Sequence, residues 1–430
     1  MKLFSTYLNS ISDIIDKSKV ETFSVNSNSN YTLQHFEKSM LNDGLEVQRG
    51  NKNNKVLIEF DNNQLSNLFG ANQFSFTEPS IGSHPDFKDL KHNEFKSHYC
   101  VSMFMDIKGS TNLNGKYTLL QIREIKDTVL TLAIHVASHF GGHVNRLQGD
   151  GAFLQFARKE QSEHDAVINA LNTASIITHF ISSDLANVFE SNQVKPLRVR
   201  IGIDLGFKED VIWSHYGIQG CSELTTTSLH TDLAAKLQSK AKSNGILIGE
   251  NIREILDIKE EFCQTCLDKE KKKDYYIYQG SINYRKYDFN WIKYLRSFDF
   301  ISKASNSDTL EITKKKIRLK CRIRDSENDE FKSYYQNSKA IKKGSTIEYS
   351  IEENNRPYHK KAWETIEWTA KNSGKEAKEA NELEHNFEGN YKNKTICKTG
   401  AGYVGHHYVE CVIKRKYLDN IKLRFPIFVK

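Results

Sequence analysis

The sequence predicts an α/β domain, in which helices flank a mixed sheet, followed by a separate strand-rich C-terminal domain. The run HYCVSMFMDI at 98–107 is apolar almost throughout, which is typical of a strand in the middle of a buried sheet. Apolar residues at helical spacing over 119–136, and a second helical pattern over about 162–186, alternate with strand patterns. Beyond residue 312, by contrast, only strand patterns recur.

The remaining elements of the α/β domain follow in order. After the first strand and helix, GGHVNRLQGDGAFLQFA at 141–157 predicts two strands joined by a Gly-Asp-Gly turn, because glycine supplies the positive φ that tight turns need. The second helix comes next. We then expect a strand at 197–206, a third helix that ends at Gly245, and strands at 246–249 and 274–279.

The chain is expected to divide into four segments. Residues 1–92 are polar and rich in Asn and Ser, which predicts a partly ordered N-terminal extension with one helix at 5–17 and a strand at 55–60. The other segments are the α/β domain (93–282), a linker (283–312) and the strand-rich domain (313–430), whose expected strands are KIRLKCRIRD, STIEYSIE, AWETIEWTAKN, HHYVECVIKR and KLRFPIFVK.

The composition favours a cytoplasmic protein that does not enter a membrane. No stretch approaches the ~18 uninterrupted apolar residues of a membrane helix, and the N-terminus carries carboxylates where a signal peptide needs an apolar run. Seven scattered cysteines predict reduced thiols rather than a disulfide framework. Residues 301–430 contain 27 Lys and Arg against 18 Asp and Glu, and we interpret this excess as a solvated face in preference to a nucleic-acid site.

Two aspartates mark a candidate metal site. Asp106 ends the buried strand in MDIKGST (105–111), and Asp150 lies in the turn of RLQGDGAF (146–153). If the two strands are neighbours, both carboxylates meet at one edge of the sheet, where their oxygens suit Mg²⁺ or Mn²⁺ carrying nucleotide phosphates. The turn KGST before a helix also offers backbone N–H groups to a triphosphate. The competing interpretation is that each aspartate only stabilises a turn.

Four motifs, MFMDIKGST, RLQGDGAFLQF, RVRIGIDLG and TDLAAKLQSKA, resemble in this order the class III nucleotide cyclases. The resemblance covers about residues 95–280 and implies a class III cyclase sandwich there. It implies that Asp106, Asp150 and the backbone carbonyl of Ile107 bind two Mn²⁺ or Mg²⁺ ions per active site. It also implies that the ribose 3′-oxygen attacks the α-phosphate and releases pyrophosphate, in a head-to-tail homodimer whose active sites lie across the interface.

The residues that read the base in this family differ here from those of purine cyclases. By the resemblance they are Arg146, four residues before the second metal aspartate, and Thr225. Arginine donates in a fork and suits the carbonyl oxygens of a pyrimidine; uracil offers O2 and O4, whereas cytosine carries an amino group at C4. Tyr99 is a candidate for narrowing the pocket against purines, although a core tyrosine is the ordinary interpretation.

The expected third helix also departs from the family. By the resemblance, Asp232 and Lys236 orient the ribose and stabilise charge at the α-phosphate, where the family has Asn and Arg. Lysine keeps the charge but loses the fork of arginine, which leaves a catalytically inactive cyclase-like module as an alternative. The family places a triphosphate-binding lysine near KEKKKD (269–274), and Lys272 is the candidate.

The C-terminal segment resembles the sensor domain appended to adenylyl/guanylyl cyclases and nucleotidyltransferases in bacterial anti-phage operons. Trp368, Asn372-Ser373-Gly374 and Gly405-His406 carry this resemblance. The adjacent His406 and His407 suggest a metal site, but no third ligand is near in the sequence, and a strand-edge or ligand-contact role fits better.

The combination of the two domains resembles the pyrimidine cyclases of Pycsar anti-phage defence. This resemblance implies a cyclic pyrimidine nucleotide as second messenger and a responsive effector protein encoded nearby. Because Arg146 favours carbonyl oxygens, the sequence predicts a uridylate cyclase that converts UTP to 3′,5′-cyclic UMP and pyrophosphate. A cytidylate cyclase that makes cyclic CMP is the alternative substrate assignment.

Overall fold

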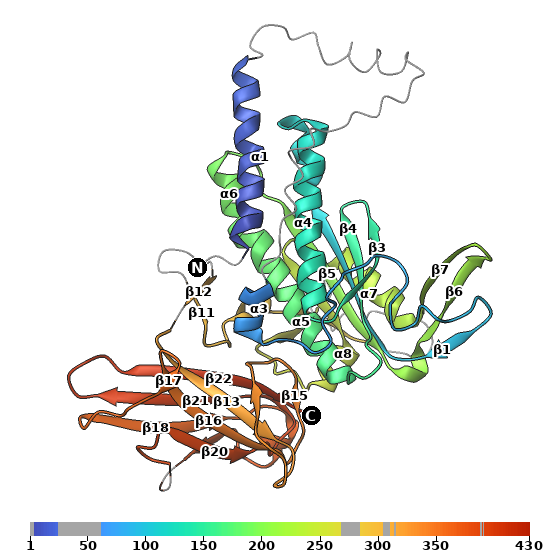
Figure 1. Ribbon diagram of the computed structural model, residues 1–430. Coiled ribbons are helices and arrows are strands. Elements are labelled where there is room, and N and C mark those ends of the chain that lie inside the picture. Colours follow the sequence, from blue (N-terminus) through green and yellow to red (C-terminus); the bar gives the residue numbers. More distant parts are fainter. Residues whose placement is uncertain are drawn as a thin grey trace, which may run out of the picture.

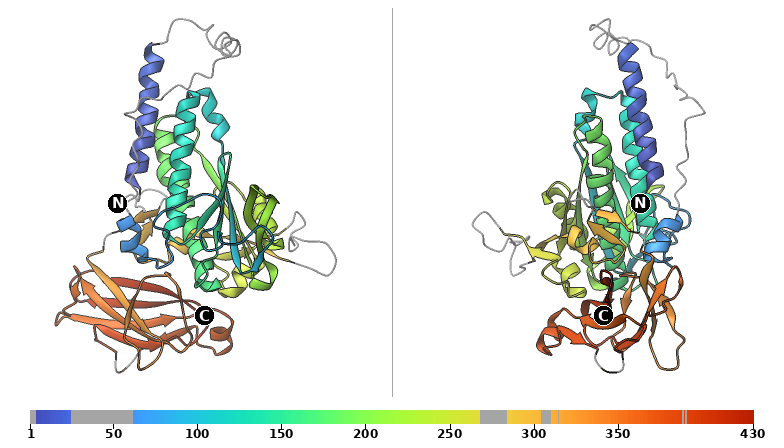
Figure 2. Two further views of the ribbon diagram at one scale, coloured as in Figure 1. Left: turned by 45° about the vertical axis from the view of Figure 1, so that its right-hand side comes forward. Right: turned by 90° about the vertical axis from the view of Figure 1, so that its left-hand side faces the viewer.

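The computed structural model describes residues 4–24, 62–267, 284–303, 310–313, 315–387, 389 and 391–430. An α/β part carries the N-terminal helices, and a β-sandwich formed by the C-terminal residues lies against one end of it (Figure 1). Two further views show the same arrangement (Figure 2). Among the described helices, none combines the length and apolar character needed to cross a bilayer.

A seven-stranded sheet forms the centre of the α/β part, in the order β3-β4-β2-β5-β8-β10-β9. The pair β5–β8 is parallel and the other neighbours are antiparallel, which confirms the predicted mixed sheet. The strands are β2 (Cys100–Lys108), β3 (His143–Gln148), β4 (Gly151–Phe156), β5 (Arg198–Gly206), β8 (Gly245–Gly249), β9 (Cys263–Thr265) and β10 (Lys286–Phe289).

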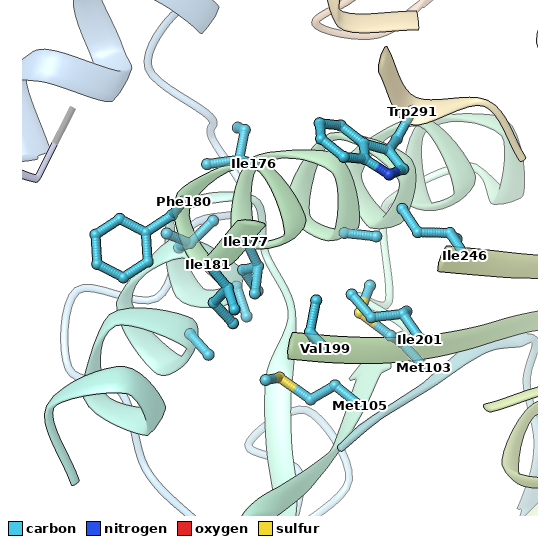
Figure 3. Packing of buried hydrophobic residues seen from close by; sticks show 14 of the residues in the cluster. Met103, Met105, Ile176, Ile177, Phe180, Ile181, Val199, Ile201, Ile246 and Trp291 are labelled. Carbon is cyan, nitrogen blue, oxygen red and sulfur yellow. The ribbon is translucent and has the colours of Figure 1, made fainter. Parts of the chain in front are cut away.

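Two long helices cover one face of this sheet. The first, α4 (Leu119–His139), begins at a capping box in which Thr118 and Gln121 exchange hydrogen bonds, and this box satisfies backbone groups at the start of the helix. The second, α5 (Glu163–His179), continues through a π-helical segment (Phe180–Leu185) into α6 (Ala186–Ser191). Isoleucines of α5 lie over Met103, Met105, Val199 and Ile201 of the sheet (Figure 3).

The opposite face of the sheet carries α7 (Leu229–Lys240). Ile201 lies under α5, and successive side chains of a strand point to opposite faces of the sheet. Position 202 therefore faces the side that carries α7. A Cβ atom at Gly202 would lie 2.2 Å from backbone atoms of α7, so glycine alone allows the helix to pack this closely. The short helix α8 (Glu250–Ile255) follows β8.

The N-terminal segment belongs to the core of the α/β part. The predicted helix is confirmed as α1 (Ser5–Ser24), which packs on α4, with Tyr7 and Ile11 buried. A further helix, α3 (Asn62–Phe69), buries Leu65 and Phe69 in the same core. The strand predicted at 55–60 lies outside the described residues.

A three-stranded sheet extends from the α/β part and was not expected from the sequence. It consists of β1 (Phe95–Ser97), β6 (Ile212–Ile218) and β7 (Cys221–Thr227), in the order β1-β6-β7. The hairpin of β6 and β7, which we call the arm, stands out on one side of the molecule (Figure 1). Trp213 anchors the arm, since its ring is fully buried and stacks on Phe87 at a centroid distance of 4.2 Å.

The prediction of a linker at 283–312 is wrong for its first half, which contains a strand of the main sheet and a helix. Strand β10 pairs with β8 inside the main sheet, and the short helix α9 (Trp291–Leu295) follows it. Tyr287, Phe289 and Tyr294 are buried there, so these aromatic residues fill the core and do not form a solvated connector. The strand predicted at 274–279 lies outside the described residues. Further on, β11 (Ile301–Lys303) and β12 (Leu310–Ile312) pair with each other.

Two five-stranded sheets form the C-terminal sandwich and contain all five predicted strands. One sheet has the order β14-β13-β16-β17, with β20 also paired to β16, and the other has the order β15-β22-β21-β18-β19. The elements are β13 (Ile317–Arg324), β14 (Lys332–Tyr334), β15 (Ala340–Ile341), β16 (Thr346–Glu353), β17 (Arg356–Pro357), β18 (Glu364–Lys371), α10 (Lys375–Glu379), β19 (Glu384–Asn386), β20 (Ile396–Gly400), β21 (Gly405–Arg415) and β22 (Ile421–Val429).

Buried polar contacts join the sandwich to α5, and we call this contact the seam. The side chain of Asn172 on α5 donates to the carbonyl of Asn337 at 3.1 Å and accepts from the hydroxyl of Tyr294 at 2.7 Å. Asn337 in turn contacts His406 Nε2 through its amide nitrogen at 3.2 Å. Asp165 at the start of α5 accepts from the backbone of Ala340. The seam therefore links the two parts of the molecule through buried polar side chains, of which Asn172 uses both ends of its amide.

Candidate active site

A pocket of about 570 Å³ opens on the face of the main sheet that carries α7, and we call it the sheet pocket. Its volume falls within the range of about 300–1,000 Å³ that is usual for small-molecule sites. The lining residues come from β2, β3, β4, the arm and α7, and they are Phe104, Met105, Asp106, Asn145, Arg146, Gln148, Gly151, Ala152, Phe153, Tyr216, Thr225, Thr226, Thr231 and Gln238.

The strands that carry the two predicted metal aspartates are neighbours. In the antiparallel register of β2 and β4, Asp106 lies opposite Gly151, the residue after Asp150. The backbone N–H of Ile107 donates to the carbonyl of Asp150 at 3.2 Å, which fixes the turn beside the end of β2. A Cβ atom at Gly151 would lie 2.7 Å from the carbonyl oxygen of Met105, so only glycine fits at this close approach.

Each of the two carboxylates has polar partners that the sequence did not indicate. Arg200, which lies opposite Asp106 on β5, donates to Asp106 Oδ2 at 2.5 Å. The hydroxyl of Ser110 donates to Asp150 Oδ2, and the ammonium of Lys126 lies 3.6 Å from the same oxygen. The cations Arg200 and Lys126 offset the negative charge of the two aspartates, and Ser110 adds a hydrogen bond. The alternating charges of LRVRIGIDLG were a possible signal for Arg200, because every second residue of a strand shares a face.

The oxygen atoms of Asp106 and Asp150 suit a divalent cation whose remaining ligands come from the phosphates of a substrate and from water. Within the described ranges, no three His, Cys, Asp or Glu side chains cluster as a complete metal site. The carboxylates of Asp106 and Asp150 are about one quarter exposed, so their hard oxygen atoms can supply part of a coordination shell. The backbone of Ile107, whose N–H donates to the carbonyl of Asp150, lies beside them. Mg²⁺ is characteristically held by one or two carboxylates, with phosphate oxygens and water completing its shell.

Ser110 belongs to a short 3₁₀ helix and not to the longer helix that the sequence predicts after MDIKGST. This 3₁₀ helix spans Ser110–Gly115, preceded by Gly109 with a positive φ, and α4 begins only at Leu119. The expected helix N-terminus beside the aspartates is therefore replaced by a tight turn that directs the hydroxyl of Ser110 to Asp150.

Arg146 and Thr225 both line the sheet pocket. Arg146 follows a β-bulge at Asn145 on β3, and its Nε donates to Glu223 Oε1 on the arm at 3.0 Å. Glu223 and Thr225 are two residues apart on β7 and therefore share a face. Glu223 was missed by the sequence reasoning, because the arm itself was not predicted.

A flat apolar wall lies beside these polar groups. The rings of Phe104 on β2 and Phe153 on β4 stack at a centroid distance of 4.3 Å with an angle of 4° between their planes, and both line the sheet pocket. Neither ring was identified as part of a site from the sequence, since each also fits the pattern of a buried strand. Aromatic faces of this kind suit a planar ring of a ligand.

Of the four other predicted site residues, three do not line the sheet pocket and one lies outside the described residues. Tyr99 is buried, does not line the sheet pocket, and donates from its hydroxyl to the backbone carbonyls of Arg158 and Gln161. A role for Tyr99 in narrowing the pocket is therefore wrong, because the tyrosine is a satisfied core residue. Asp232 and Lys236 lie one turn apart on α7, and both are exposed and outside the lining of the pocket. Lys272 lies outside the described residues.

A buried polar network holds the beginning of α7 against the sheet. Asp204 on β5 is fully buried and accepts from the hydroxyl of Tyr284 at 2.7 Å, and its other oxygen lies 3.0 Å from Nδ1 of His230. Burial alone lowers the pKa of His230, but the hydrogen bond and charge of Asp204 outweigh it, so the pKa is raised. Burial also raises the pKa of Asp204. The network thus positions α7, which supplies Thr231 and Gln238 to the pocket.

His406 and His407 do not form a metal site with other described residues. His406 is buried in the seam, where its Nε2 contacts Asn337, and its ring packs against Phe262. His407 accepts from the backbone N–H of Ser373 and contacts the carbonyl of Tyr403 through Nε2. Burial lowers the pKa of His407 to about 4, so this ring is neutral near pH 7.

Residues 295–422 match the family model described as the adenylyl/guanylyl and SMODS C-terminal sensor domain. A cytidylate cyclase from Staphylococcus aureus is 38% identical over 357 residues, which cover 81% of this chain and 82% of the relative. A cytidylate cyclase from Escherichia coli is 33% identical over 340 residues, or 74% of this chain and 69% of the relative. Among solved structures, an adenylyl cyclase from P. aeruginosa aligns with 46% of this chain and 95% of its own, at 19% identity and a TM-score of 0.37.

The alignment with the Staphylococcus aureus relative covers 81% of this chain, which is more than either the segment before the sandwich or the sandwich alone, so it includes residues of both. The motifs that contain Asp106 and Asp150 thus occur in a chain that aligns over most of its length with a relative named cytidylate cyclase. The protein belongs to the family of these cytidylate cyclases, and it is a class III nucleotide cyclase with a C-terminal sensor domain.

Proposed function

We propose that this nucleotide cyclase is a cytidylate cyclase, which converts CTP to 3′,5′-cyclic CMP and pyrophosphate. The observation that carries the proposal is the ion pair of Arg146 and Glu223 beside the pocket that contains Asp106. The relatives named cytidylate cyclase support the same substrate. The uridylate assignment, which rested on Arg146 alone, is the less supported alternative.

The ion pair supplies both a donor and an acceptor to a base. The edge of cytosine presents acceptors at O2 and N3 and a donor amino group at C4, and a carboxylate is a suitable acceptor for that amino group. Arg146 has the donors that O2 and N3 require, and Glu223 has the acceptor. Uracil carries an oxygen at C4, which a carboxylate beside it would repel.

The proposed reaction forms one bond and breaks one. The 3′-oxygen of the ribose loses its proton and bonds to the α-phosphorus, while the bond from that phosphorus to the bridging oxygen breaks and pyrophosphate leaves. Divalent cations would lower the pKa of the attacking hydroxyl and neutralise charge on the leaving group. Asp106, Asp150 and the carbonyl of Ile107 would hold them, and Mn²⁺ and Mg²⁺ both suit such oxygen ligands.

The remaining catalytic groups are proposed to come from a second copy of the chain. Asp232 and Lys236 are exposed and do not line the sheet pocket of their own chain. The arm is also exposed and carries apolar side chains, Ile212, Tyr216 and Ile218, of the kind that protein interfaces bury. In a head-to-tail homodimer, Lys236 of one copy would face the α-phosphate held by the other, and Asp232 would accept from the ribose.

We further propose that cyclic CMP acts as a second messenger in anti-phage defence. This role rests on the resemblance of the two-domain chain to pyrimidine cyclases of defence systems, and on the match of its C-terminal residues to a sensor domain. The messenger would bind an effector protein that is encoded nearby. A defence role requires that infection raises cyclic CMP in cells that carry the wild-type gene.

The test is incubation of the protein with each of the four nucleoside triphosphates and Mn²⁺, followed by identification of the cyclic product by mass. Cyclic CMP should form fastest. A larger yield of cyclic UMP than of cyclic CMP would contradict this proposal and identify a uridylate cyclase. Asp150→Asn should abolish turnover, whereas the matched control Asp127→Asn, at an exposed aspartate of α4, should retain it. Nucleotide binding without release of pyrophosphate by the wild type would instead identify an inactive cyclase-like module.

A further inference from the structure

A second cavity, of about 290 Å³, lies within the C-terminal sandwich, and we call it the sandwich cavity. Its walls come from β16 and β20 of one sheet and from β18, β21 and β22 of the other. The exposed residues Gly400, Gly402 and His385 lie on its lining, so the cavity opens to solvent. It shares no lining residue with the sheet pocket.

The lining of the sandwich cavity combines aromatic rings with uncharged polar groups. Tyr349, Phe387 and Tyr403 contribute aromatic residues, and Asn372 and Thr399 contribute polar residues. Tyr349 is fully buried, and its hydroxyl has no hydrogen-bond partner in the described part of the chain. A buried hydroxyl without a partner destabilises a fold, so its presence in a cavity wall is informative about function.

The charge of the lining distinguishes this cavity from the sheet pocket. No lysine or arginine lines the sandwich cavity, and its one carboxylate is Glu382. His407 is also in the wall and is neutral near pH 7, because burial lowers its pKa to about 4. The other histidine of the lining, His385, lies 3.6 Å from Glu382. An anionic nucleotide would therefore meet a carboxylate and no lysine or arginine, in contrast to the sheet pocket, where Arg146 is part of the lining.

We propose that the sandwich cavity binds a regulatory ligand, namely a small, uncharged heteroaromatic molecule with hydrogen-bond donors, no larger than a nucleoside. The volume lies at the lower end of the range for small-molecule sites. The aromatic rings match a planar ring of the ligand, and Glu382 and Asn372 provide acceptors for its donors. This proposal does not depend on which nucleotide the cyclase converts.

The wall of the cavity leads directly to the seam. His407 contacts backbone groups of Ser373 and Tyr403 at the cavity. The residue before it, His406, contacts Asn337, whose carbonyl accepts from Asn172 on α5 of the cyclase part. A ligand that shifts the backbone around His407 therefore acts on contacts that reach a helix packed over the catalytic sheet (Figure 3).

Binding can be measured with neutral nucleosides as probes, using cytidine, uridine, adenosine and guanosine against the full-length protein by saturation-transfer NMR and calorimetry. At least one nucleoside should bind saturably, and its 5′-monophosphate should bind at least tenfold more weakly. The variant Gly402→Trp should weaken binding at least tenfold, because a Cβ atom at Gly402 meets no atom within 4 Å and the indole can occupy the mouth without disrupting the fold.

The matched control is Ser333→Trp, which adds the same side chain to an exposed position of β14 in the same sandwich and should leave binding unchanged. Arg146→Ala in the sheet pocket should also leave it unchanged. Failure of all four nucleosides to bind, equal binding of the monophosphate, or loss of binding in Arg146→Ala and not in Gly402→Trp would overturn the proposal. Because binding is measured without turnover, this result is independent of the proposed cytidylate cyclase activity.

Regulation by the bound probe has a separate readout. Saturation with the nucleoside that binds should change the rate of pyrophosphate release at least twofold in the wild type and leave the rate of Gly402→Trp unchanged. A nucleoside that binds at the sandwich cavity without any change in rate would contradict a regulatory role.

Discussion

Glu223 changes the interpretation of Arg146. From the sequence, Arg146 is a lone forked donor, which favours the two carbonyl oxygens of uracil. In the structure its guanidinium is paired with the carboxylate of Glu223, so the two side chains together offer donors and an acceptor. A single residue that was not noticed in the sequence is therefore the basis for proposing cytosine in place of uracil as the preferred base.

The variant Glu223→Gln tests this pair. It keeps the size of the side chain but adds an amide donor that can face O4 of uracil, so the ratio of kcat/KM for CTP to that for UTP should fall about tenfold, which corresponds to about 1.4 kcal/mol. The exposed Glu209→Gln, near the start of the arm, serves as the control and should leave the ratio unchanged. An unchanged ratio in Glu223→Gln would show that Glu223 does not contact the base.

Gly151 has a role that depends on its lack of a side chain. The variant Gly151→Ala would place Cβ 2.7 Å from the carbonyl of Met105 and push the turn of Asp150 away from Asp106. We expect at least a tenfold loss of kcat and a destabilisation of roughly 1–3 kcal/mol, as is typical of overpacking. Gly115→Ala, where a Cβ atom meets nothing within 4 Å, should be near neutral in a thermal melt. Wild-type activity in Gly151→Ala would contradict the required close approach.

At the scale of elements, α7 depends on the protonation of the network at its N-terminus. The folded-state pKa of His230 is raised above its ordinary value of 6.5, mainly by Asp204 against the effect of burial. The folded state therefore binds the proton more tightly than the unfolded state, and this contribution to stability is complete below about pH 6.5 and lost as the pH rises through the folded-state pKa. The pKa of Asp204 is also raised, so protonation of this carboxyl likewise stabilises the folded state, in a lower pH range.

The melting temperature should accordingly fall between pH 6 and pH 8.5 by more in the wild type than in His230→Gln, which cannot take up the proton. Each unit by which the pKa is raised corresponds to about 1.4 kcal/mol of unfolding free energy. His385→Gln, at an exposed histidine of β19, is the control and should keep the wild-type dependence on pH. Identical pH dependence in the wild type and His230→Gln would exclude the network as its source.

The predictability of each element follows from how local its signal is. The strands β2, β3, β4, β5 and β8 of the main sheet, its long helices and the five long strands of the sandwich were predicted because each is a continuous periodic pattern. The strands β6 and β7 were missed because their polar residues, in SHYG and SELTTT, obscure the alternation. The main-sheet strand β10 has only four residues, and its place depends on pairing with β8, which local sequence does not specify.

The candidate site divides in the same way. Asp106 and Asp150 were identified because their motifs are local, and β2 and β4 then place them side by side. The partners of these carboxylates, Arg200 and Lys126, come from a different strand and a helix, so only the fold brings them into contact. Tyr99 shows the reverse case, because its position in the sequence suggested a pocket residue while its hydroxyl is satisfied by backbone carbonyls in the core.

At the scale of the whole molecule, the sandwich and the cyclase part form a single unit through the seam. Asn172 is fully buried, and both ends of its amide are used, one towards Tyr294 and the other towards Asn337. A sensor domain joined to the cyclase part by a flexible linker alone would make no such buried polar contact. The seam lies on α5, and this helix contacts both the sandwich and the main sheet of the cyclase part (Figure 2).

The proposed homodimer makes a prediction that only two copies can satisfy. Asp150→Asn and Lys236→Ala should each be inactive alone, since one lacks a metal ligand and the other lacks the cation at the α-phosphate. If the two residues act in the same site from different copies, a mixed dimer contains one site with both residues intact. An equal mixture that exchanges subunits freely should then recover roughly a quarter of wild-type activity, because about half the dimers are mixed and each has one working site of two.

The control for this experiment is a mixture of Asp150→Asn with Asp106→Asn. Both substitutions affect the same half of the site, so every site in the mixed dimer lacks one of the two carboxylates and no activity should return. Recovery with Lys236→Ala but not with Asp106→Asn would assign the two aspartates and Lys236 to opposite copies. Absence of recovery in both mixtures, with subunit exchange verified by mass spectrometry of the intact dimers, would instead place the whole active site within one chain and would require Lys236 to act from α7 on its own sheet pocket.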